Sequence, residues 1–334
     1  MSSSNDGGYT LRIEDLSITY RTVYGKLKAL NSISLAVERG ESVAIVGESG
    51  SGKSTLGLAT VRLLPPNASY DGGRIILDGN DVIKMNRGAV SRMRGRSAFM
   101  IFQDPLNTLN PVKRVDVQLL EAIQTRAKGE GKRFDDREAL KEAIDKLNDV
   151  RMPDPEMVIT RYPHQLSGGQ IQRVVISMGL LMRPKLMIAD EPTSALDVTI
   201  QAQVLKLLRD LQHEYDMSII FVTHDITVAH SIADRLVVMY AGEIVESGPA
   251  ADLVTHPMHP YADALIKSIP TTTKSQGRLM AIAGSPPDMI SPPEGCRFHP
   301  RCPQVMDICQ KKSPPVTHMK EDDVRCFLYG GSDS

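Results

Sequence analysis

The residues best suited to chemistry in this chain form a run at positions 47–55, Gly-Glu-Ser-Gly-Ser-Gly-Lys-Ser-Thr. The run matches the phosphate-loop spacing G-x-x-x-x-G-K-[ST] in full. Glycines let successive backbone N–H groups turn inward around phosphate oxygens, Lys53 supplies a positive charge, and the Ser54 hydroxyl can ligate Mg²⁺. The alternative is a glycine-rich turn with an incidental lysine. We predict that ATP contacts Gly47, Ser49, Gly50, Ser51, Gly52, Lys53, Ser54 and Thr55.

Two carboxylates follow the apolar run at 186–189. Asp190 is placed at the tip of a predicted strand, where it suits a Mg²⁺ ion held through water. Glu191 comes next, and we predict that it polarises the water that attacks the γ-phosphate. An acidic pair at a strand end is by itself more often only solvated, so this prediction depends on the other motifs.

A second glycine-containing motif is Leu-Ser-Gly-Gly-Gln at positions 166–170, directly before an apolar helical pattern. Its two glycines permit close backbone approach, and the Ser167 hydroxyl with the helix N-terminus suits an anion. The alternative is an ordinary helix cap. The predicted binding residues here are Ser167, Gly168, Gly169 and Gln170.

All the cysteines fall near the end of the chain, at Cys296, Cys302, Cys309 and Cys326. Their gaps contain no C-x₂-C pair, so a standard zinc ribbon fits poorly. Four thiolates could hold a [4Fe–4S] cluster or a tetrahedral zinc ion, and free thiols are the third possibility.

The elements that must position these residues follow from the hydrophobic pattern. The phosphate loop lies between a buried strand at 42–46 and a helix at 54–64, which is the context that such a loop requires. Short apolar runs at 186–189 and 219–222 are typical of parallel strands that are buried on both faces. Further strands are predicted at 11–20, 32–37, 74–78, 236–240 and 243–247, and helices at 115–152, 171–181 and 199–214.

The composition narrows the class of protein. The net charge is -1, aromatic residues make up 4% and tryptophan is absent, which argues against a nucleic-acid binder. No apolar run is long enough to span a bilayer, and the N-terminus lacks the pattern of a secretion signal. We therefore expect a cytosolic chain that reaches a membrane only by docking on other chains.

Three motifs follow one another along the chain: the phosphate loop at 47–55, Leu-Ser-Gly-Gly-Gln at 166–170 and the carboxylates at 190–191. In this order they resemble the ATP-binding subunits of ABC transporters, and the resemblance runs from about residue 10 to residue 328. It implies an α/β P-loop NTPase fold with a RecA-like parallel sheet core, an antiparallel β subdomain and an α-helical subdomain. The implied domains are an ATP-binding domain at 10–268, with its helical subdomain at about 104–180, and a small Cys-rich extension at 269–334.

The resemblance also implies roles for single residues. Gln103 matches the glutamine loop that senses Mg²⁺, and His224 matches the switch histidine that contacts the γ-phosphate. Asp197 matches a loop at the dimer interface. Tyr20 matches an aromatic residue that stacks on adenine, and Tyr24 is the alternative for that position. The motif at 166–170 would contact the ATP that is held by a partner subunit.

The C-terminal part resembles the extension of oligopeptide and dipeptide permease ATP subunits, on Gly295-Cys296, the run Pro-Arg-Cys-Pro at 300–303 and the late Cys326. That subfamily associates the extension with an iron–sulfur cluster. The implied partners are two integral-membrane permease subunits, a second ATP-binding subunit, in a heterodimer rather than a homodimer, and an extracytoplasmic substrate-binding protein. The implied location is the cytoplasmic face of the membrane, as a peripheral subunit. Peptides are the first expectation for the cargo, and oligosaccharides or nickel are the alternatives.

Two other functions fit less well. A soluble ABC ATPase acting on DNA or ribosomes usually carries a long coiled coil or a second cassette, and this chain has neither. An exporter subunit is disfavoured by the permease-like extension.

Overall fold

The structure is a computed structural model that describes residues 8–104, 108–193, 197–268 and 282–330. The chain divides into two compact units. Of the described residues, the first contains those within 8–10, 38–40 and 77–220, and the second contains those within 11–37, 41–76 and 221–330. Strand β8 (Ser218–Thr223) runs from the first unit into the second.

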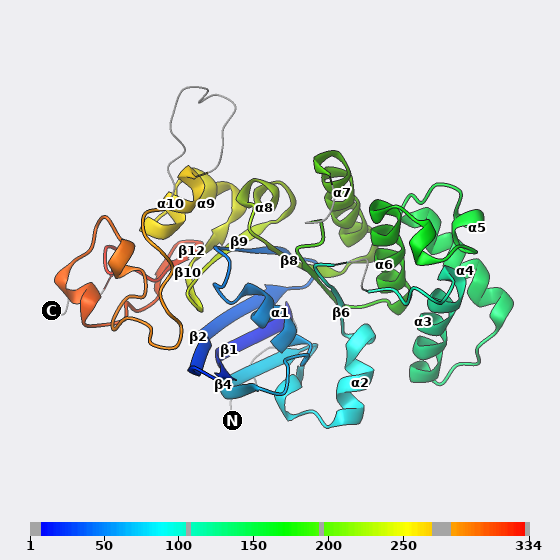
Figure 1. The fold of residues 1–334 in the computed structure, drawn as a ribbon, viewed down its shortest axis with the longest axis horizontal. Helices are drawn as coiled ribbons and strands as arrows, with labels where there is room; N and C mark the ends of the chain where they lie inside the picture. Colours follow the sequence, from blue (N-terminus) through cyan, green and yellow to red (C-terminus); the bar gives the residue numbers. More distant parts are fainter. Residues whose placement is uncertain (1–7, 105–107, 194–196, 269–281, 331–334) are drawn as a thin grey trace. The chain divides into compact units, whose positions relative to one another are not determined.

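The first unit combines a pair of parallel strands with a group of helices (Figure 1). β6 and β7 pair in parallel, with Met100 opposite Ile188 and Ile101 opposite Ala189. Every residue of β7 is buried, as its continuous apolar sequence predicts. The elements of this unit are β5 (Asn80–Asp81), η2 (Val82–Lys84), α2 (Arg87–Arg96), β6 (Ala98–Ile101), α3 (Val115–Glu130), α4 (Asp136–Asp149), α5 (Pro155–Val158), η4 (Pro163–Gln165), α6 (Gly168–Met182), β7 (Leu186–Asp190) and α7 (Val198–Tyr215).

Helices α3, α4 and α6 pack against one another and are tied together by one buried arginine. Arg126 on α3 donates to both carboxylate oxygens of Glu142 on α4, at 2.8 and 2.6 Å. It also donates to the carbonyl of Leu181 on α6 at 2.5 Å. Because a guanidinium can bind several acceptors in one plane, a single side chain fixes three helices.

The second unit contains two sheets. In one, the strand order is β2-β1-β4, and in the other it is β11-β12-β10-β9-β3. β3 pairs with β9 in parallel, whereas β10 pairs with β9 and with β12 in antiparallel. The elements are β1 (Tyr9–Thr22), β2 (Gly25–Glu38), β3 (Ser42–Val46), α1 (Lys53–Thr60), β4 (Ala68–Leu77), α8 (Ile226–Ile232), β9 (Arg235–Tyr240), β10 (Glu243–Pro249), α9 (Ala250–Thr255), α10 (Pro260–Lys267), η5 (His299–Arg301), η6 (Asp307–Gln310), β11 (Thr317–Met319) and β12 (Asp322–Val324).

The strands and helices predicted from the sequence are present, and their ends differ. The predicted helix at 54–64 ends at Thr60, because Arg62 takes a left-handed conformation with φ of 56°. The predicted helical region at 115–152 is two helices, separated at Gly131, whose φ is 66°. The strand predicted at 32–37 begins at Gly25. The predicted domain boundary at residue 268 adjoins residues 269–281, which lie outside the described residues, and it stays a prediction.

Within the described residues, no helix is long and apolar enough to cross a bilayer.

Candidate nucleotide-binding site

The phosphate loop leaves the buried strand β3 and ends in the first turn of α1. Its glycines have positive φ, at 155° for Gly47, 79° for Gly50 and 102° for Gly52. A Cβ atom added to Gly47 would lie 2.1 Å from the carbonyl oxygen of Met239 on β9. Because glycine has no side chain, the loop can lie directly against β9 at this point.

Lys53 is almost fully buried, with 6% of its surface exposed. Its Nζ donates to the carbonyls of Gly47 at 2.8 Å and Glu48 at 2.9 Å, and it lies 3.5 Å from the Ser51 hydroxyl. The ammonium group is thus held within the curve of the loop by three oxygens. Ser54, the predicted Mg²⁺ ligand, is exposed in the first turn of α1. These residues fit a nucleotide phosphate chain with its metal ion.

Two more predicted site residues belong to the same unit. The Tyr20 hydroxyl lies 3.3 Å from Oγ1 of Thr55, so the structure brings Tyr20 to the helix that follows the phosphate loop. Its competitor Tyr24 is 85% exposed. His224 is exposed directly after β8 and before α8, whose N-terminus is capped by the side chain of Asp225. The carboxyl end of a buried strand thus presents the histidine.

The first unit brings together Gln103 and Glu191. Gln103 follows β6 and Glu191 follows β7, and these two strands are parallel neighbours, so their carboxyl ends lie side by side. Gln103 Nε2 donates to Glu191 Oε2 at 2.9 Å. Asp190, the last residue of β7, is 7% exposed. The Gln103 amide holds the Glu191 carboxylate in one orientation, which suits a group that must align a water molecule.

The motif at 166–170 forms the start of α6. Ser167 is the N-cap, and its hydroxyl accepts from the Gln170 N–H at 3.3 Å. The Gln170 side chain accepts in turn from the Ser167 N–H at 3.0 Å, which completes a capping box. A Cβ atom on Gly169 would meet Ile200 at 3.0 Å, so the glycine permits close packing against α7. The capping box and the predicted anion contact both involve the N-terminus of α6.

Asp197 is exposed and caps α7 through a 3.0 Å hydrogen bond from the Ile200 N–H. Residues 194–196, which precede it in the predicted dimer-seam loop, lie outside the described residues. The structure gives Asp197 a local capping role, and its contact with a partner subunit stays a prediction.

The four cysteines line one small cavity of about 10 Å³, together with Phe298, Met306 and Phe327. All are free thiols. Burial raises the pKa of Cys296 to about 12, and it also raises the pKa values of Cys302 and Cys326. Burial thus favours the neutral thiol form of Cys296, Cys302 and Cys326. The space that the cysteines line is about the size of one water molecule.

Among the described residues, no group of three or more His, Cys, Asp or Glu side chains is placed to hold a metal ion. The predicted gathering of four cysteines is therefore present, whereas a formed tetrahedral metal centre is not. The donor set suits a cluster or a zinc ion, but the cavity would have to widen before it could hold either.

Sequence reasoning missed a contact between the phosphate loop and the C-terminal extension. Glu48, the second residue of the loop, forms a bidentate pair with Arg301, which lies between Cys296 and Cys302. Arg301 stands in the run Pro-Arg-Cys-Pro at 300–303, which contains no local sign of a distant partner. Since the two charged residues are 253 positions apart, no local pattern could have paired them.

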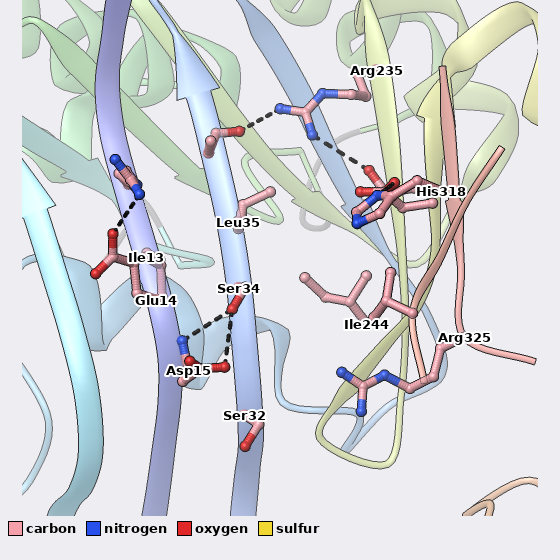
Figure 2. A pocket seen from close by; sticks show the side chains of 15 residues that line it. Ile13, Glu14, Asp15, Ser32, Ser34, Leu35, Arg235, Ile244, His318 and Arg325 are labelled. Carbon is pink, nitrogen blue, oxygen red and sulfur yellow. Dashed lines mark hydrogen bonds and ion pairs between the residues drawn. The ribbon is translucent and has the colours of Figure 1, made fainter. Parts of the chain in front are cut away.

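The second unit also has an open cleft of about 630 Å³ between strands β1 and β2 and the C-terminal strands (Figure 2). Its charged groups largely neutralise one another. Arg12 pairs with Glu14 at 2.8 Å, and His318 contacts Asp323 at 2.5 Å. Arg235 pairs with Glu41 at 2.7 Å. The cleft therefore lacks the cluster of like charges that marks a phosphate site.

Comparison with known proteins identifies the family. The profile of the ABC transporter family matches residues 30–194, and that of the oligopeptide/dipeptide transporter C-terminal region matches residues 245–309. The chain is 43% identical over 308 residues to the oligopeptide transport ATP-binding protein OppD of Bacillus subtilis, covering 92% of this chain and 85% of that protein. The chain belongs to the ABC transporter ATP-binding family.

Other relatives agree with this assignment. The dipeptide transport ATP-binding protein DppD of Bacillus subtilis is 41% identical over 320 residues, which is 95% of this chain and 94% of that protein. Among solved structures, the ATP-binding cassette MJ0796, in a post-hydrolysis dimer bound to ADP and Pi, matches with a TM-score of 0.63 and 27% identity. That match covers 72% of this chain and 98% of the other. An ABC cassette is an ATPase, so the predicted fold class and the predicted enzyme activity are confirmed.

Proposed function

We propose that this chain is the ATP-hydrolysing subunit of an ABC importer for oligopeptides or dipeptides. The observation that carries the proposal is the pairing, in one chain, of an ABC cassette with the C-terminal region of the oligopeptide and dipeptide transporters. Relatives at about 40% identity, named as oligopeptide and dipeptide transport ATP-binding proteins, support the cargo.

The phosphate loop is the proposed cradle for ATP. Its N–H groups would surround the phosphates, and Lys53 would exchange its carbonyl partners for phosphate oxygens. Ser54, Gln103 and Asp190 are the proposed Mg²⁺ ligands, the last through water. A bound Mg²⁺ ion would neutralise charge on the phosphate oxygens. Tyr20 is proposed to stack on the adenine, which its contact with Thr55 supports.

Glu191 is the proposed general base. Held by the Gln103 amide, its carboxylate would orient the attacking water and accept its proton. His224 would contact the γ-phosphate. The α6 N-terminus, with Ser167 at its cap, would contact the ATP of a partner subunit. Hydrolysis would then depend on two ATP-binding subunits, and we propose a heterodimer rather than a homodimer.

The helices of the first unit are the proposed contact with two membrane permease subunits, on the cytoplasmic face of the membrane. Several large apolar side chains on this unit are exposed, at 79% for Val112, 50% for Met157 and 43% for Val117. Exposed apolar groups are typical of protein contacts when they gather in a patch. An extracytoplasmic binding protein would select the cargo.

Co-purification from native membranes in mild detergent tests this proposal. We expect two integral-membrane proteins, a second ATP-binding subunit and a binding protein to accompany the chain. Recovery of soluble partners alone, such as ribosomes, would overturn the transport function while leaving the ATPase intact. The binding protein can then be titrated with peptides, oligosaccharides and nickel. Tight binding of a sugar or of nickel, without peptide binding, would replace the proposed cargo.

We propose separately that the four cysteines hold a [4Fe–4S] cluster, with zinc or free thiols as the alternatives. Their convergence on one cavity supports a shared ligand. Such a ligand would crosslink segments that are distant in sequence, a structural role. Protein purified without oxygen should be brown, absorb at about 400 nm and contain about four irons per chain. One zinc per chain without iron, or no metal at all, would refute the cluster.

A further inference from the structure

The outer side of the phosphate loop is fixed by Arg301, a residue of the cysteine-containing extension. Nη1 of Arg301 donates to Glu48 Oε2 at 2.7 Å, and Nη2 donates to Glu48 Oε1 at 3.1 Å. The remaining donors reach the carbonyls of Ala283 at 2.8 Å and Ile282 at 3.4 Å, and the Tyr240 hydroxyl at 3.3 Å. All five N–H groups of the guanidinium are therefore used.

This arrangement is unlike a surface ion pair. The Arg301 side chain is 4% exposed, and that of Glu48 is 25% exposed. The hydrogen bonds to Glu48 raise the pKa of Arg301 above its ordinary value, so the group is charged throughout the physiological range. A lysine could supply the charge but not the fork of two parallel bonds. The geometry therefore fixes the direction of the Glu48 side chain as well as its charge.

The backbone of Glu48 is held from the same side. Its N–H donates to the hydroxyl of Tyr261 at 2.8 Å. Tyr261 is fully buried and packs on Tyr240 and on Phe298, with ring centroids 4.6 and 5.4 Å away. Phe298 lies in the same short segment as Arg301, between Cys296 and Cys302. Arg301 thus fixes the side chain of Glu48, and Tyr261, which packs on Phe298 of the extension, fixes its main chain.

A second arginine of this segment supports the loop indirectly. Arg297 donates to the carbonyl of Ala241 and pairs with Glu243 at 3.3 Å. The neighbouring Gly242 N–H donates to the Ser51 carbonyl within the phosphate loop at 2.9 Å. Both arginines between the two cysteines therefore act on the loop, one directly and one through the β9–β10 turn.

We infer that Arg301 is a positioning residue for ATP binding, and that residues 296–302 form a supporting wall of the phosphate loop. The inference rests on the proposed role of that loop in holding ATP. Without the Glu48–Arg301 pair, the Glu48 side chain loses its fixed direction. We then expect the loop to hold its N–H groups less precisely, although Tyr261 still binds the Glu48 N–H. Because these N–H groups contact the bound substrate and the transition state alike, the loss falls on KM and leaves kcat nearly unchanged.

The experiment uses the full chain and a fluorescent ATP analogue, titrated against the wild type, Arg301→Met, Arg301→Lys, Glu48→Gln and the Glu48→Gln/Arg301→Met double variant. Arg325→Met is the matched control, because Arg325 belongs to the same extension and its Nε has no partner. Melting temperatures show whether each variant folds. KM and kcat are measured in the assembled transporter. Lys53→Ala tests the loop itself.

We expect Arg301→Met and Glu48→Gln each to weaken binding about five- to twenty-fold, which corresponds to about 1–2 kcal/mol. The double variant should be no weaker than the poorer single variant, because both remove the same pair. Arg301→Lys should recover part of the affinity, and Arg325→Met should match the wild type. KM should rise while kcat changes less than twofold.

Two results would overturn the inference. One is wild-type affinity in folded Arg301→Met and Glu48→Gln protein. The other is an additive loss in the double variant, which would mean that the residues act separately. If Lys53→Ala binds ATP normally, the proposed role of the phosphate loop fails instead, so the two failures can be told apart. Should Arg301→Met not fold, Glu48→Gln decides the question alone.

Discussion

Replacing Glu191 with glutamine tests the proposed chemistry most directly. Glu191 has a φ of 43°, a conformation that strains glutamate and glutamine equally. Its partner, the Gln103 amide, donates at 2.9 Å and can donate equally well to a glutamine carbonyl. We therefore expect the free energy of unfolding to change by less than about 1 kcal/mol. The site keeps its shape and loses only the group that accepts a proton.

The expected cost to the reaction is much larger. Removal of a general base lowers turnover by about 10²–10⁴-fold, or about 2.7–5.5 kcal/mol in the activation barrier. ATP turnover is measured in the assembled transporter, and ATP affinity is measured with a fluorescent analogue. Affinity should remain within about twofold of the wild type, since the base contributes to the transition state rather than to binding. Glu156→Gln, an exposed glutamate in the same unit, should behave as the wild type.

Turnover within twofold of the wild type in Glu191→Gln would refute the role of this residue as the base. A loss of affinity equal to the loss of turnover would also refute it, because the carboxylate would then act in binding.

Two further predictions concern Lys53 and Glu246. Lys53→Ala should weaken ATP binding at least about 100-fold, because it removes the ammonium group that the loop holds within its curve. Binding within about threefold of the wild type would contradict the phosphate-loop assignment. Glu246 is 1% exposed and accepts from the Met258 and His259 N–H groups at 2.9 and 2.7 Å. Burial raises its pKa to about 7, from 4.5. The folded state therefore binds this proton more tightly than the unfolded state, and the resulting stability is lost as the pH rises from about 4.5 through about 7. The free energy of unfolding is measured in urea at about pH 5.5 and pH 8, and its decrease between the two should be roughly 2 kcal/mol smaller in Glu246→Gln than in the wild type. Glu294→Gln, at an exposed site, should show the same decrease as the wild type. An unchanged decrease in Glu246→Gln would show that this carboxyl does not titrate in that range.

Much of the nucleotide site followed from short stretches of sequence, because its chemistry depends on neighbouring residues. The glycines at 47, 50 and 52 were predicted to shape a loop, and each takes the positive φ that such a loop needs. The helix predicted at 171–181 is present and begins at Gly168, because Ser167 and Gln170, three residues apart, form a capping box within one turn. Strands β3 and β7 were recognisable because each contains four consecutive apolar residues, at 43–46 and 186–189, and both strands are fully buried in the structure.

The fold alone decided the contacts that join distant residues. Gln103 and Glu191 meet because β6 and β7 are parallel neighbours in a fixed register, which pairing energies across the whole sheet determine. The four cysteines converge on one cavity although thirty positions separate the first from the last. Arg301 reaches Glu48 across 253 positions because aromatic packing around Tyr261 and Phe298 places the extension beside the loop. Local sequence specifies turns and caps through forces that act within a few residues, whereas these partners are chosen by burial and sheet pairing over the whole chain.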